Sequence, residues 1–129
     1  MREIKFRCWF NNQMHNVESI DFQCQTVNIN APYRVSFMEC EIMQYTGLKD
    51  KNGVEIYEGD IVKCKLLDQI KKNGKWINVE TFEKYEVIYS EDDLGFRFKD
   101  EWMAIWKFEN CELEVIGNIY ENKLKEEGK

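Results

Sequence analysis

The sequence lacks the closely spaced residues from which metal sites and disulfide frameworks are built. Its five cysteines stand at positions 8, 24, 40, 64 and 111, an odd number at wide spacings with no C-x-x-C pair. A structural zinc site needs ligands about two to four residues apart, and a disulfide framework in a secreted domain needs paired cysteines. We therefore expect reduced thiols, most of them buried as small apolar side chains, and no metal or cofactor.

Catalytic motifs are also missing. The single histidine, His15, has no serine or cysteine at a recognisable motif spacing, so nucleophilic catalysis has little support. There is no glycine-rich phosphate loop, no Walker pattern and no G-x-S-x-G. Glu91–Asp93 is the densest carboxylate cluster. A solvated acidic loop is the favoured interpretation there, and a weak Mg²⁺ or Ca²⁺ site is the alternative. The prediction is a protein that is not an enzyme and has no catalytic residues.

Long apolar runs are absent as well. The longest covers residues 102–106, five residues, whereas a membrane-spanning helix needs about twenty. The opening residues alternate charged and apolar side chains, unlike a signal peptide. We expect a cytoplasmic protein without a membrane partner.

The chain is acidic, with a net charge of −6. Residues 1–75 carry 11 Lys/Arg against 10 Asp/Glu, and residues 76–129 carry 7 against 14, so the excess acid lies in the second part. Affinity for nucleic acid depends on a basic surface. This balance argues against tight non-specific binding to duplex DNA, although a local basic face remains open.

What the sequence does have is a period-two alternation of apolar and polar residues, which is typical of half-buried strands. Predicted strands, separated by Gly, Asn and Asp turns, are Ile4–Phe10, Thr26–Ile29, Tyr33–Met38, Glu41–Thr46, Val54–Tyr57, Ile61–Leu67, Trp76–Val79, Lys84–Tyr89, Phe96–Lys99 and Glu112–Tyr120. Residues 100–109 fit a strand or a single helical turn, and the charged tail from Glu121 fits a frayed end or a short helix. The pattern predicts one all-β domain over residues 1–129, with at most one or two short helices. Its architecture would be a compact antiparallel barrel or sandwich.

The segment Gln44–Val62, QYTGLKDKNGVEIYEGDIV, resembles the signature of the YopX-like proteins, a family found in phages and bacterial prophages. The opening Arg2–Trp9 and the closing Glu114–Asn122 resemble the two ends of that family. The resemblance therefore spans the chain. It implies a mainly β domain in a bacterial host cell. It carries over no catalytic residues, because the family's biochemical function is not established.

Within this signature, Gly47, Gly53 and Gly59 each stand at a predicted chain reversal, where glycine supplies positive φ. Asn52-Gly53 suits a two-residue hairpin loop. The two aspartates, Asp50 and Asp60, are expected to accept hydrogen bonds from turn amides. The two tyrosines, Tyr45 and Tyr57, either pair across strands or face a ligand. A folding element is the favoured interpretation. A recognition edge is the alternative, with Tyr45, Lys49, Asp50 and Tyr57 as candidate binding residues.

A second candidate lies in the basic hairpin that follows. Positive charge surrounds one aromatic ring there, through Lys63, Lys65, Lys71, Lys72, Lys75 and Trp76. Lysines beside an exposed ring suit single-stranded nucleic acid. Against this, Glu80, Glu83 and Glu86 stand on the partner strands, and a mixed-charge hairpin with Trp76 in the core is the simpler interpretation. The leading hypothesis is an accessory phage protein that binds an unknown protein or assembles with itself. The alternative is binding of single-stranded nucleic acid through the Lys63–Trp76 hairpin.

Overall fold

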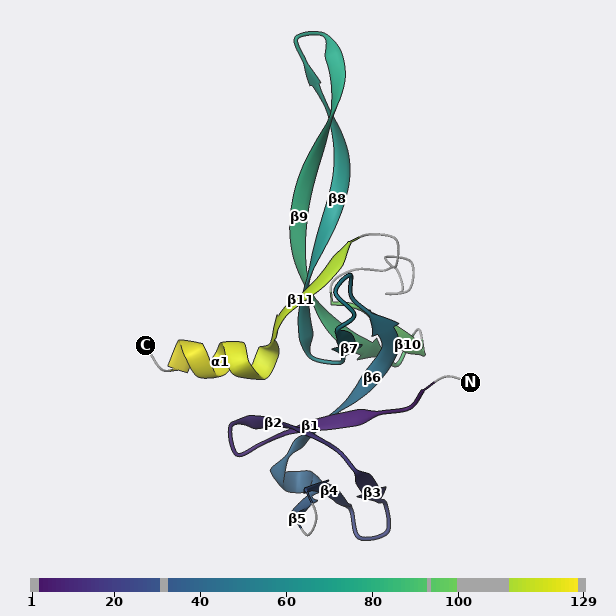
Figure 1. Ribbon diagram of the computed structural model, residues 1–129, viewed down its shortest axis with the longest axis vertical. Helices are drawn as coiled ribbons and strands as arrows, with labels where there is room; N and C mark the ends of the chain where they lie inside the picture. Colours follow the sequence, from purple (N-terminus) through teal and green to yellow (C-terminus); the bar gives the residue numbers. More distant parts are fainter. Residues whose placement is uncertain (1–2, 31–32, 93, 100–111, 128–129) are drawn as a thin grey trace.

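The computed structural model describes residues 3–30, 33–92, 94–99 and 112–127. Antiparallel strands make up most of this structure, with one short 3-10 helix and one α-helix among the described residues (Figure 1). The elements are β1 Phe6–Phe10, β2 Gln13–Asn16, β3 Ser19–Asp21, β4 Thr26–Asn30, β5 Tyr33–Ser36, η1 Phe37–Glu39, β6 Glu41–Lys49, β7 Glu55–Tyr57, β8 Asp60–Lys72, β9 Lys75–Ser90, β10 Gly95–Phe98, β11 Leu113–Asn118 and α1 Ile119–Glu127. The all-β prediction is confirmed, and the strands form a curled antiparallel half-barrel.

The strands are arranged in three hydrogen-bonded groups. The orders are β2-β1-β6-β7, β3-β4-β5 and β10-β9-β8-β11, and every pairing among the described strands is antiparallel. In Figure 1, β1 to β5 form the lower part of the molecule, the third group forms the upper part, and β6 rises between them to β7, which lies beside β10. The signature segment runs from β6 through β7 into β8, so it joins the lower and upper parts.

The lower part has its own apolar core. Cys8 at the centre of β1 is fully buried, and it packs with residues of β4, β5 and the start of β6. The buried members are Cys8, Val27, Ile29, Val35 and Cys40. Alternation explains this set, because every second residue of β1 and β4 turns to the same side.

The upper part has a second core. Its buried members are Ile56, Val62, Cys64, Val87, Phe98 and Leu113. The ring of Phe98 stacks on that of Tyr85 with centroids 4.8 Å apart. Residues from β7, β8, β9, β10 and β11 therefore meet in one cluster, which anchors the base of the β8–β9 hairpin.

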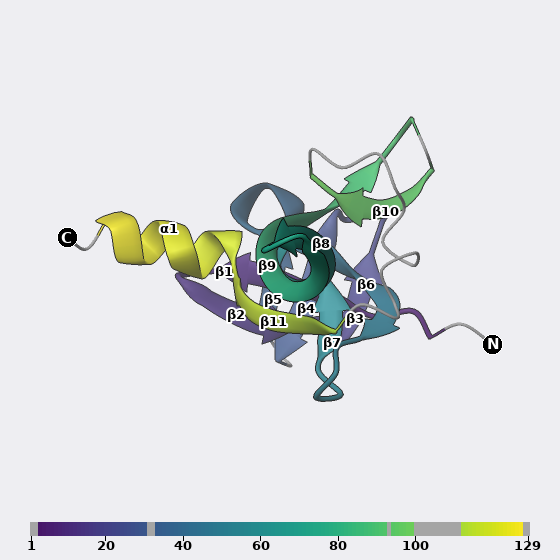
Figure 2. The same ribbon diagram turned by 90° about the horizontal axis from the view of Figure 1, so that it is seen from above.

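The β8–β9 hairpin extends far beyond this core. Its register is continuous from Ile61↔Glu86 to Lys72↔Lys75. Among the described strands, β11 accompanies β8 only as far as Cys64, and β10 accompanies β9 only from Val87. Residues 65–82, called the arm from here on, therefore form a ribbon of two strands that projects away from the body (Figure 1). Seen end-on, the two strands wind around each other (Figure 2), as strongly twisted two-stranded ribbons do.

The arm differs from the sequence prediction in its length. The predicted strand Ile61–Leu67 continues to Lys72, and the strands predicted at Trp76–Val79 and Lys84–Tyr89 are one strand, β9. The apolar alternation lapses at residues 80–84, but backbone pairing needs no apolar side chains. The tip is the two-residue loop Asn73-Gly74, in which φ is 54° and 78°, as a type I′ turn requires.

Other differences are local. Strands β2 and β3 were not predicted, and Phe37–Met38 belongs to the 3-10 helix instead of a strand. The last strand ends at Asn118, and α1 begins at Ile119, two residues before the tail predicted from Glu121. The element predicted at residues 100–109 lies outside the described residues.

Two turns of the signature also differ from expectation. Asn52-Gly53 is not a two-residue loop with positive φ at both positions, because only Gly53 has positive φ, at 81°. Instead the amide of Gly53 donates to the carbonyl of Asp50 at 3.0 Å, and the reversal spans Lys51–Gly53. Gly47, with φ of 89°, lies inside β6 at a shift in the β6–β7 register, so it makes a bulge and not a reversal.

Candidate functional site

The two signature tyrosines pair with each other across β6 and β7. Tyr45 lies directly opposite Tyr57 in the register, and their ring centroids are 5.5 Å apart. The Lys5 ammonium lies 5.7 Å from the Tyr45 ring centre, and the Arg7 guanidinium lies 4.6 Å from that of Tyr57. Both tyrosines are buried, and burial raises the pKa of each phenol. These rings are interior packing groups instead of a face open to a ligand.

Asp50 holds the signature turn to the last strand. One carboxylate oxygen accepts from the amides of Asn52 at 2.8 Å and Val54 at 2.9 Å, and the other accepts from the amide of Val115 at 2.9 Å. Burial alone would raise the pKa of Asp50, but the three amides together hold the pKa below its ordinary value. The expected hydrogen bonds to turn amides are confirmed, and Asp50 has a structural role.

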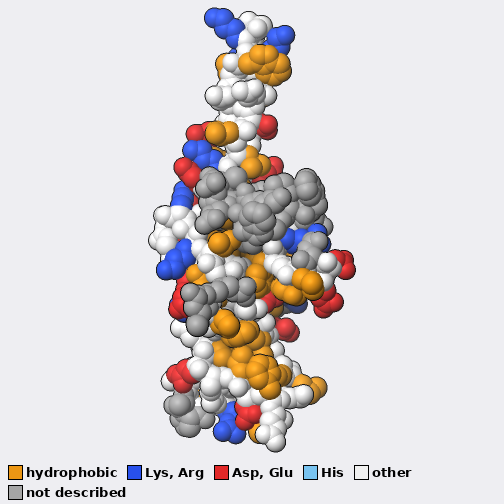
Figure 3. All heavy atoms as spheres, turned by 90° about the vertical axis from the view of Figure 1, so that its right-hand side faces the viewer, with side chains coloured by type: hydrophobic (Ala, Val, Ile, Leu, Met, Phe, Trp, Pro, Cys, Tyr) orange, Lys and Arg blue, Asp and Glu red, His pale blue; other side chains and the backbone are white. Residues whose placement is uncertain are grey.

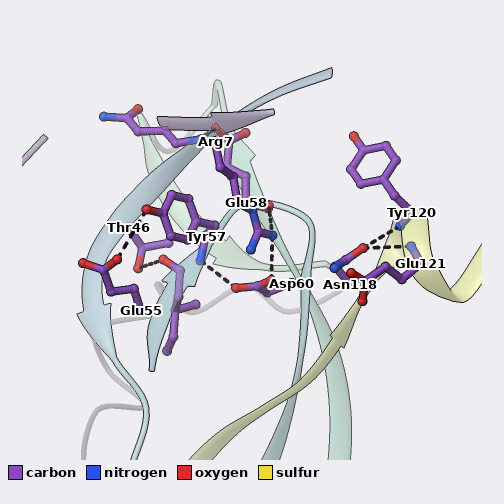
Figure 4. A network of polar contacts seen from close by, with 11 residues as sticks. Arg7, Thr46, Glu55, Tyr57, Glu58, Asp60, Asn118, Tyr120 and Glu121 are labelled. Atoms are coloured by element: carbon purple, nitrogen blue, oxygen red, sulfur yellow. Dashed lines mark hydrogen bonds and ion pairs between the residues drawn. The ribbon is translucent and has the colours of Figure 1, made fainter. Parts of the chain in front are cut away.

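Asp60 is the centre of a buried polar network (Figure 4). Its carboxylate accepts from the amide of Tyr57 at 2.8 Å and from the Arg7 guanidinium at 2.6 Å. The side chain of Asp60 is 2% exposed and that of Arg7 is 12% exposed. Burial raises the pKa of Asp60, against the opposing pull of the Arg7 charge. Since Arg7 belongs to β1 and Asp60 to β8, this ion pair joins the lower and upper parts of the molecule.

The same corner receives the C-terminal helix. Asn118 accepts from the amides of Tyr120 at 3.1 Å and Glu121 at 2.9 Å, which is an N-terminal cap (Figure 4). The amide of Ile119 donates to the carbonyl of Gly59 at 2.9 Å. Gly59 has φ of 83°, and a Cβ there would meet Met43 Sδ at 3.3 Å and the Tyr120 ring of the helix at 3.4 Å. Thus a glycine of the signature leaves space for the helix as well as making a turn.

Of the four candidate binding residues in the signature, only Lys49 lies on the surface. Tyr45, Asp50 and Tyr57 are buried. The geometry of this segment is therefore that of a folding element, which was the favoured interpretation of the sequence.

A groove of about 540 Å³ lies beside the signature, between the start of β1 and the strands β2, β3 and β7. Two of its charged residues are paired, because Lys5 Nζ contacts Glu55 at 2.5 Å, and Lys5 Nζ also contacts Glu3 at 3.0 Å. The hydrogen bond to Glu55 is the main cause that raises the pKa of Lys5. The groove thus offers a mixed polar and apolar wall whose central charges are paired within the chain.

The lysines of the basic hairpin fall into two groups. At the base, Lys63 lies over the Phe82 ring at 4.3 Å, and Lys65 Nζ contacts Glu80 at 2.9 Å and Glu112 at 3.7 Å. The expected neutralisation by Glu80 is therefore present for Lys65. At the tip, Lys71, Lys72 and Lys75 are exposed, and they form no ion pair with another described residue.

Trp76 does not lie in the core. Its side chain is 67% exposed, because β9 has left the body before it reaches this position. Large apolar side chains are exposed along the whole arm, namely Leu67, Ile70, Trp76, Ile77 and Phe82. Figure 3 shows hydrophobic side chains spaced along the arm and basic ones at its tip. Alternation in the sequence indicates an apolar face, but it does not tell whether the chain itself covers that face.

The remaining candidates are the cysteines, the single histidine and the acidic run. Cys8, Cys40 and Cys64 are buried and Cys24 is exposed, and none of these four described cysteines forms a disulfide with another. Burial raises the pKa of Cys8 to about 12. His15 Nε2 lies 3.2 Å from the carbonyl oxygen of Phe10. Among the described residues, no three His, Cys, Asp or Glu side chains gather as metal ligands, and the acidic run is described only in part because Asp93 lies outside them.

The fold and the arm together define a class of protein: an all-β domain with a curled antiparallel sheet and a protruding two-stranded ribbon. No helix in the described part of the chain has the length and apolar character to span a membrane.

The profile of the YopX protein family matches residues 5–125, and the chain belongs to this family. A solved structure, that of protein EF1440 from Enterococcus faecalis, is similar over 95% of this chain and 97% of its own, at 26% identity and a TM-score of 0.66. No curated protein matches the chain.

Proposed function

We propose that this protein is a non-enzymatic accessory protein of phage or prophage origin, and that it acts in the bacterial cytoplasm by binding protein. The arm is the binding element, and its partner is either another protein or a second copy. The observation that carries the proposal is the set of large apolar side chains exposed on a ribbon that projects from the body.

The energetics of the arm support a role in binding. A two-stranded ribbon with both faces in water is marginally stable by itself. Full burial of a large apolar side chain is worth about 1.5–3 kcal/mol. Trp76, 67% exposed, and Phe82, 52% exposed, leave much of this free energy unused in the isolated chain. A partner that covers the arm would gain it, and aromatic residues of this kind are typical anchors of interfaces.

The proposal is tested by retention from a bacterial lysate on the immobilised full-length chain, with one half of the lysate treated with nuclease. The variant Trp76→Ser/Phe82→Ser removes both anchors, and Met38→Ser, at a residue 94% exposed on the body, is the matched control. We expect the wild-type chain and the control to retain a protein, or a second copy of the chain, after nuclease treatment, and the arm variant to lose it. Equal retention by all three chains would contradict the proposal.

A second candidate is favoured by one observation at the tip, where Lys71 lies opposite the exposed Trp76 in the register, and Lys71, Lys72 and Lys75 form no ion pair with a described residue. Proteins that bind single-stranded nucleic acid without sequence preference place lysines against its phosphate backbone and stack aromatic rings on its bases. Salt-sensitive quenching of tryptophan fluorescence by an oligonucleotide, lost in Trp76→Ser, would support it. The acidic body opposes it, since residues outside 63–82 carry 13 Lys/Arg against 22 Asp/Glu, a net charge of −9.

A further inference from the structure

A cavity of about 200 Å³ opens in the lower part of the molecule, between the β1–β2 turn and the paired strands β4 and β5 (Figure 1). Three of the described residues that line it have aromatic rings, three carry side-chain amides and one is aliphatic. They are Phe10, His15 and Tyr33, then Asn11, Gln13 and Asn30, and finally Ile29. We propose that this cavity, called the amide cavity from here on, binds an unpaired nucleobase.

The β1–β2 turn contributes one wall of the amide cavity. Phe10 lies opposite Gln13 in the register, and Asn11 and Asn12 between them have φ of 54° and 59°. These values are those of a type I′ turn, and asparagine tolerates them better than most residues. His15 Nε2 lies 3.2 Å from the carbonyl oxygen of Phe10, and the two rings are inclined by 50°. The turn and this contact fix the wall before any ligand arrives.

The end of β4 and the start of β5 contribute the floor and the opposite wall. Asn30 lies opposite Tyr33 in the register. Ile29 is 8% exposed and belongs to the lower core, and Phe10 packs against the same core. Tyr33 is 65% exposed, so most of its side chain is left for a ligand to cover. The amide cavity thus has an apolar floor and an exposed aromatic ring at its side.

The lining excludes a charged occupant. None of the described residues that line the amide cavity is charged, although charged residues make up 33% of the chain. A phosphate or carboxylate would lose hydration there without meeting a counter-charge. The volume is also below the roughly 300–1,000 Å³ of sites for drug-sized ligands. The occupant is therefore a neutral group of one ring system and not a whole nucleotide.

The three side-chain amides have hydrogen-bonding capacity that the chain leaves unused. The side chains of Asn11, Gln13 and Asn30 form no hydrogen bond with another described residue. A side-chain amide presents a donor and an acceptor side by side, and Asn and Gln pair in this way with adenine. Unpaired bases are recognised by aromatic rings on their faces and hydrogen bonds to their edges. The amide cavity offers both kinds of contact in one uncharged space.

Two sources supply this chemistry, a free nucleoside and an unpaired base within a single strand. The test therefore uses adenosine and a short oligo(dA) strand as separate probes, with ribose as the probe that lacks a base. Each is titrated into the isotope-labelled full-length chain, and NMR spectra are recorded. The oligo(dA) titration uses the Trp76→Ser chain, so that the tip of the arm does not contribute a stacking ring.

We expect adenosine to shift the side-chain amide resonances of Gln13 and Asn30 and the ring resonances of His15, and ribose to shift none of them. Tyr33→Ala and Gln13→Ala should each weaken adenosine binding about tenfold, since the first removes a stacking ring and the second a paired amide. Both residues are exposed, so neither variant disturbs the core.

The matched controls are Phe22→Ala and Gln23→Ala. They remove an exposed aromatic ring and an exposed amide from the β3–β4 turn, outside the amide cavity. We expect both controls to bind adenosine as the wild type does.

The outcomes are distinct. Adenosine binding that neither Tyr33→Ala nor Gln13→Ala weakens, or ribose binding as tight as that of adenosine, would overturn the inference. So would the absence of shifts at Gln13, Asn30 and His15 with both adenosine and oligo(dA). Binding of oligo(dA) without adenosine, lost in Tyr33→Ala, would assign the site to a base within a strand, and tighter binding of adenosine would assign it to the free nucleoside.

The inference goes beyond the proposed function and does not depend on it. The amide cavity and the arm have no residue in common. Retention of a protein by the arm and binding of a base by the amide cavity are therefore separate results, and either can fail while the other stands.

Discussion

The Arg7–Asp60 ion pair allows a prediction whose size follows from the structure. At 2.6 Å between Nη2 and Oδ1, Coulomb's law with an effective dielectric constant of about 20 gives a gross attraction of about 6 kcal/mol. Much of this attraction only offsets the hydration free energy that the Asp60 carboxylate loses on burial. Removal of one partner of a buried pair leaves the other charge uncompensated, and the typical cost is about 3–5 kcal/mol. We therefore expect Arg7→Met to lower the free energy of unfolding by that amount at pH 7.5.

The pH dependence of this loss tests the cause. In Arg7→Met the burial that raises the pKa of Asp60 acts without the opposing guanidinium, so the pKa rises further. A carboxyl group whose pKa is higher in the folded state than in the unfolded state destabilises the fold when it is ionised, and protonation relieves this. The cost of Arg7→Met should therefore shrink as the pH falls from 7.5 to 4.5.

Urea unfolding followed by tryptophan fluorescence measures both effects. Asp60→Asn keeps an acceptor for the Tyr57 amide and removes only the charge, so it is the second variant of the cycle. The double variant should cost less than the sum of the two single variants, by about 1–3 kcal/mol. A cost below about 1 kcal/mol for Arg7→Met, or a cost that does not change with pH, would refute the account of a buried charge pair.

Three further predictions concern single positions. Asp50→Ala leaves three amides without their acceptor, so it should lower the free energy of unfolding, measured with urea, by about 3 kcal/mol. Because the pKa of Asp50 is depressed in the folded chain, this difference from wild type should be constant from pH 5 to 8. It should disappear only in stronger acid, below the ordinary carboxyl pKa of about 3.9. Gly59→Ala should lower the melting temperature more than Gly53→Ala, since both glycines have positive φ but only a Cβ at Gly59 meets neighbouring atoms; equal shifts would contradict the close approach of the helix. At pH 8, iodoacetamide should alkylate exposed Cys24 and spare Cys8, whose pKa is raised to about 12, and peptide mass spectrometry would detect any labelling of Cys8 in the folded chain.

Local chemistry explains which features the sequence could predict. Alternation located the buried strands because a side chain must be on one face or the other, as at Cys8, Val27 and Val62. The roles of Asp50 and Asp60 in turns followed from the reach of a short carboxylate. The contact of Asp60 with Arg7 could not be predicted, because the two residues are 53 positions apart in the sequence and alternation assigns an arginine to a solvent-exposed face.

The arm was the main feature that the sequence could not predict. Pairing over Ile61–Glu86 depends on a partner strand and a tight turn, and Asn73-Gly74 signals only the turn. Whether Trp76 is covered depends on the length of β8 and β9 relative to β10 and β11. No local pattern contains that information, so an alternating segment was interpreted as part of a closed core.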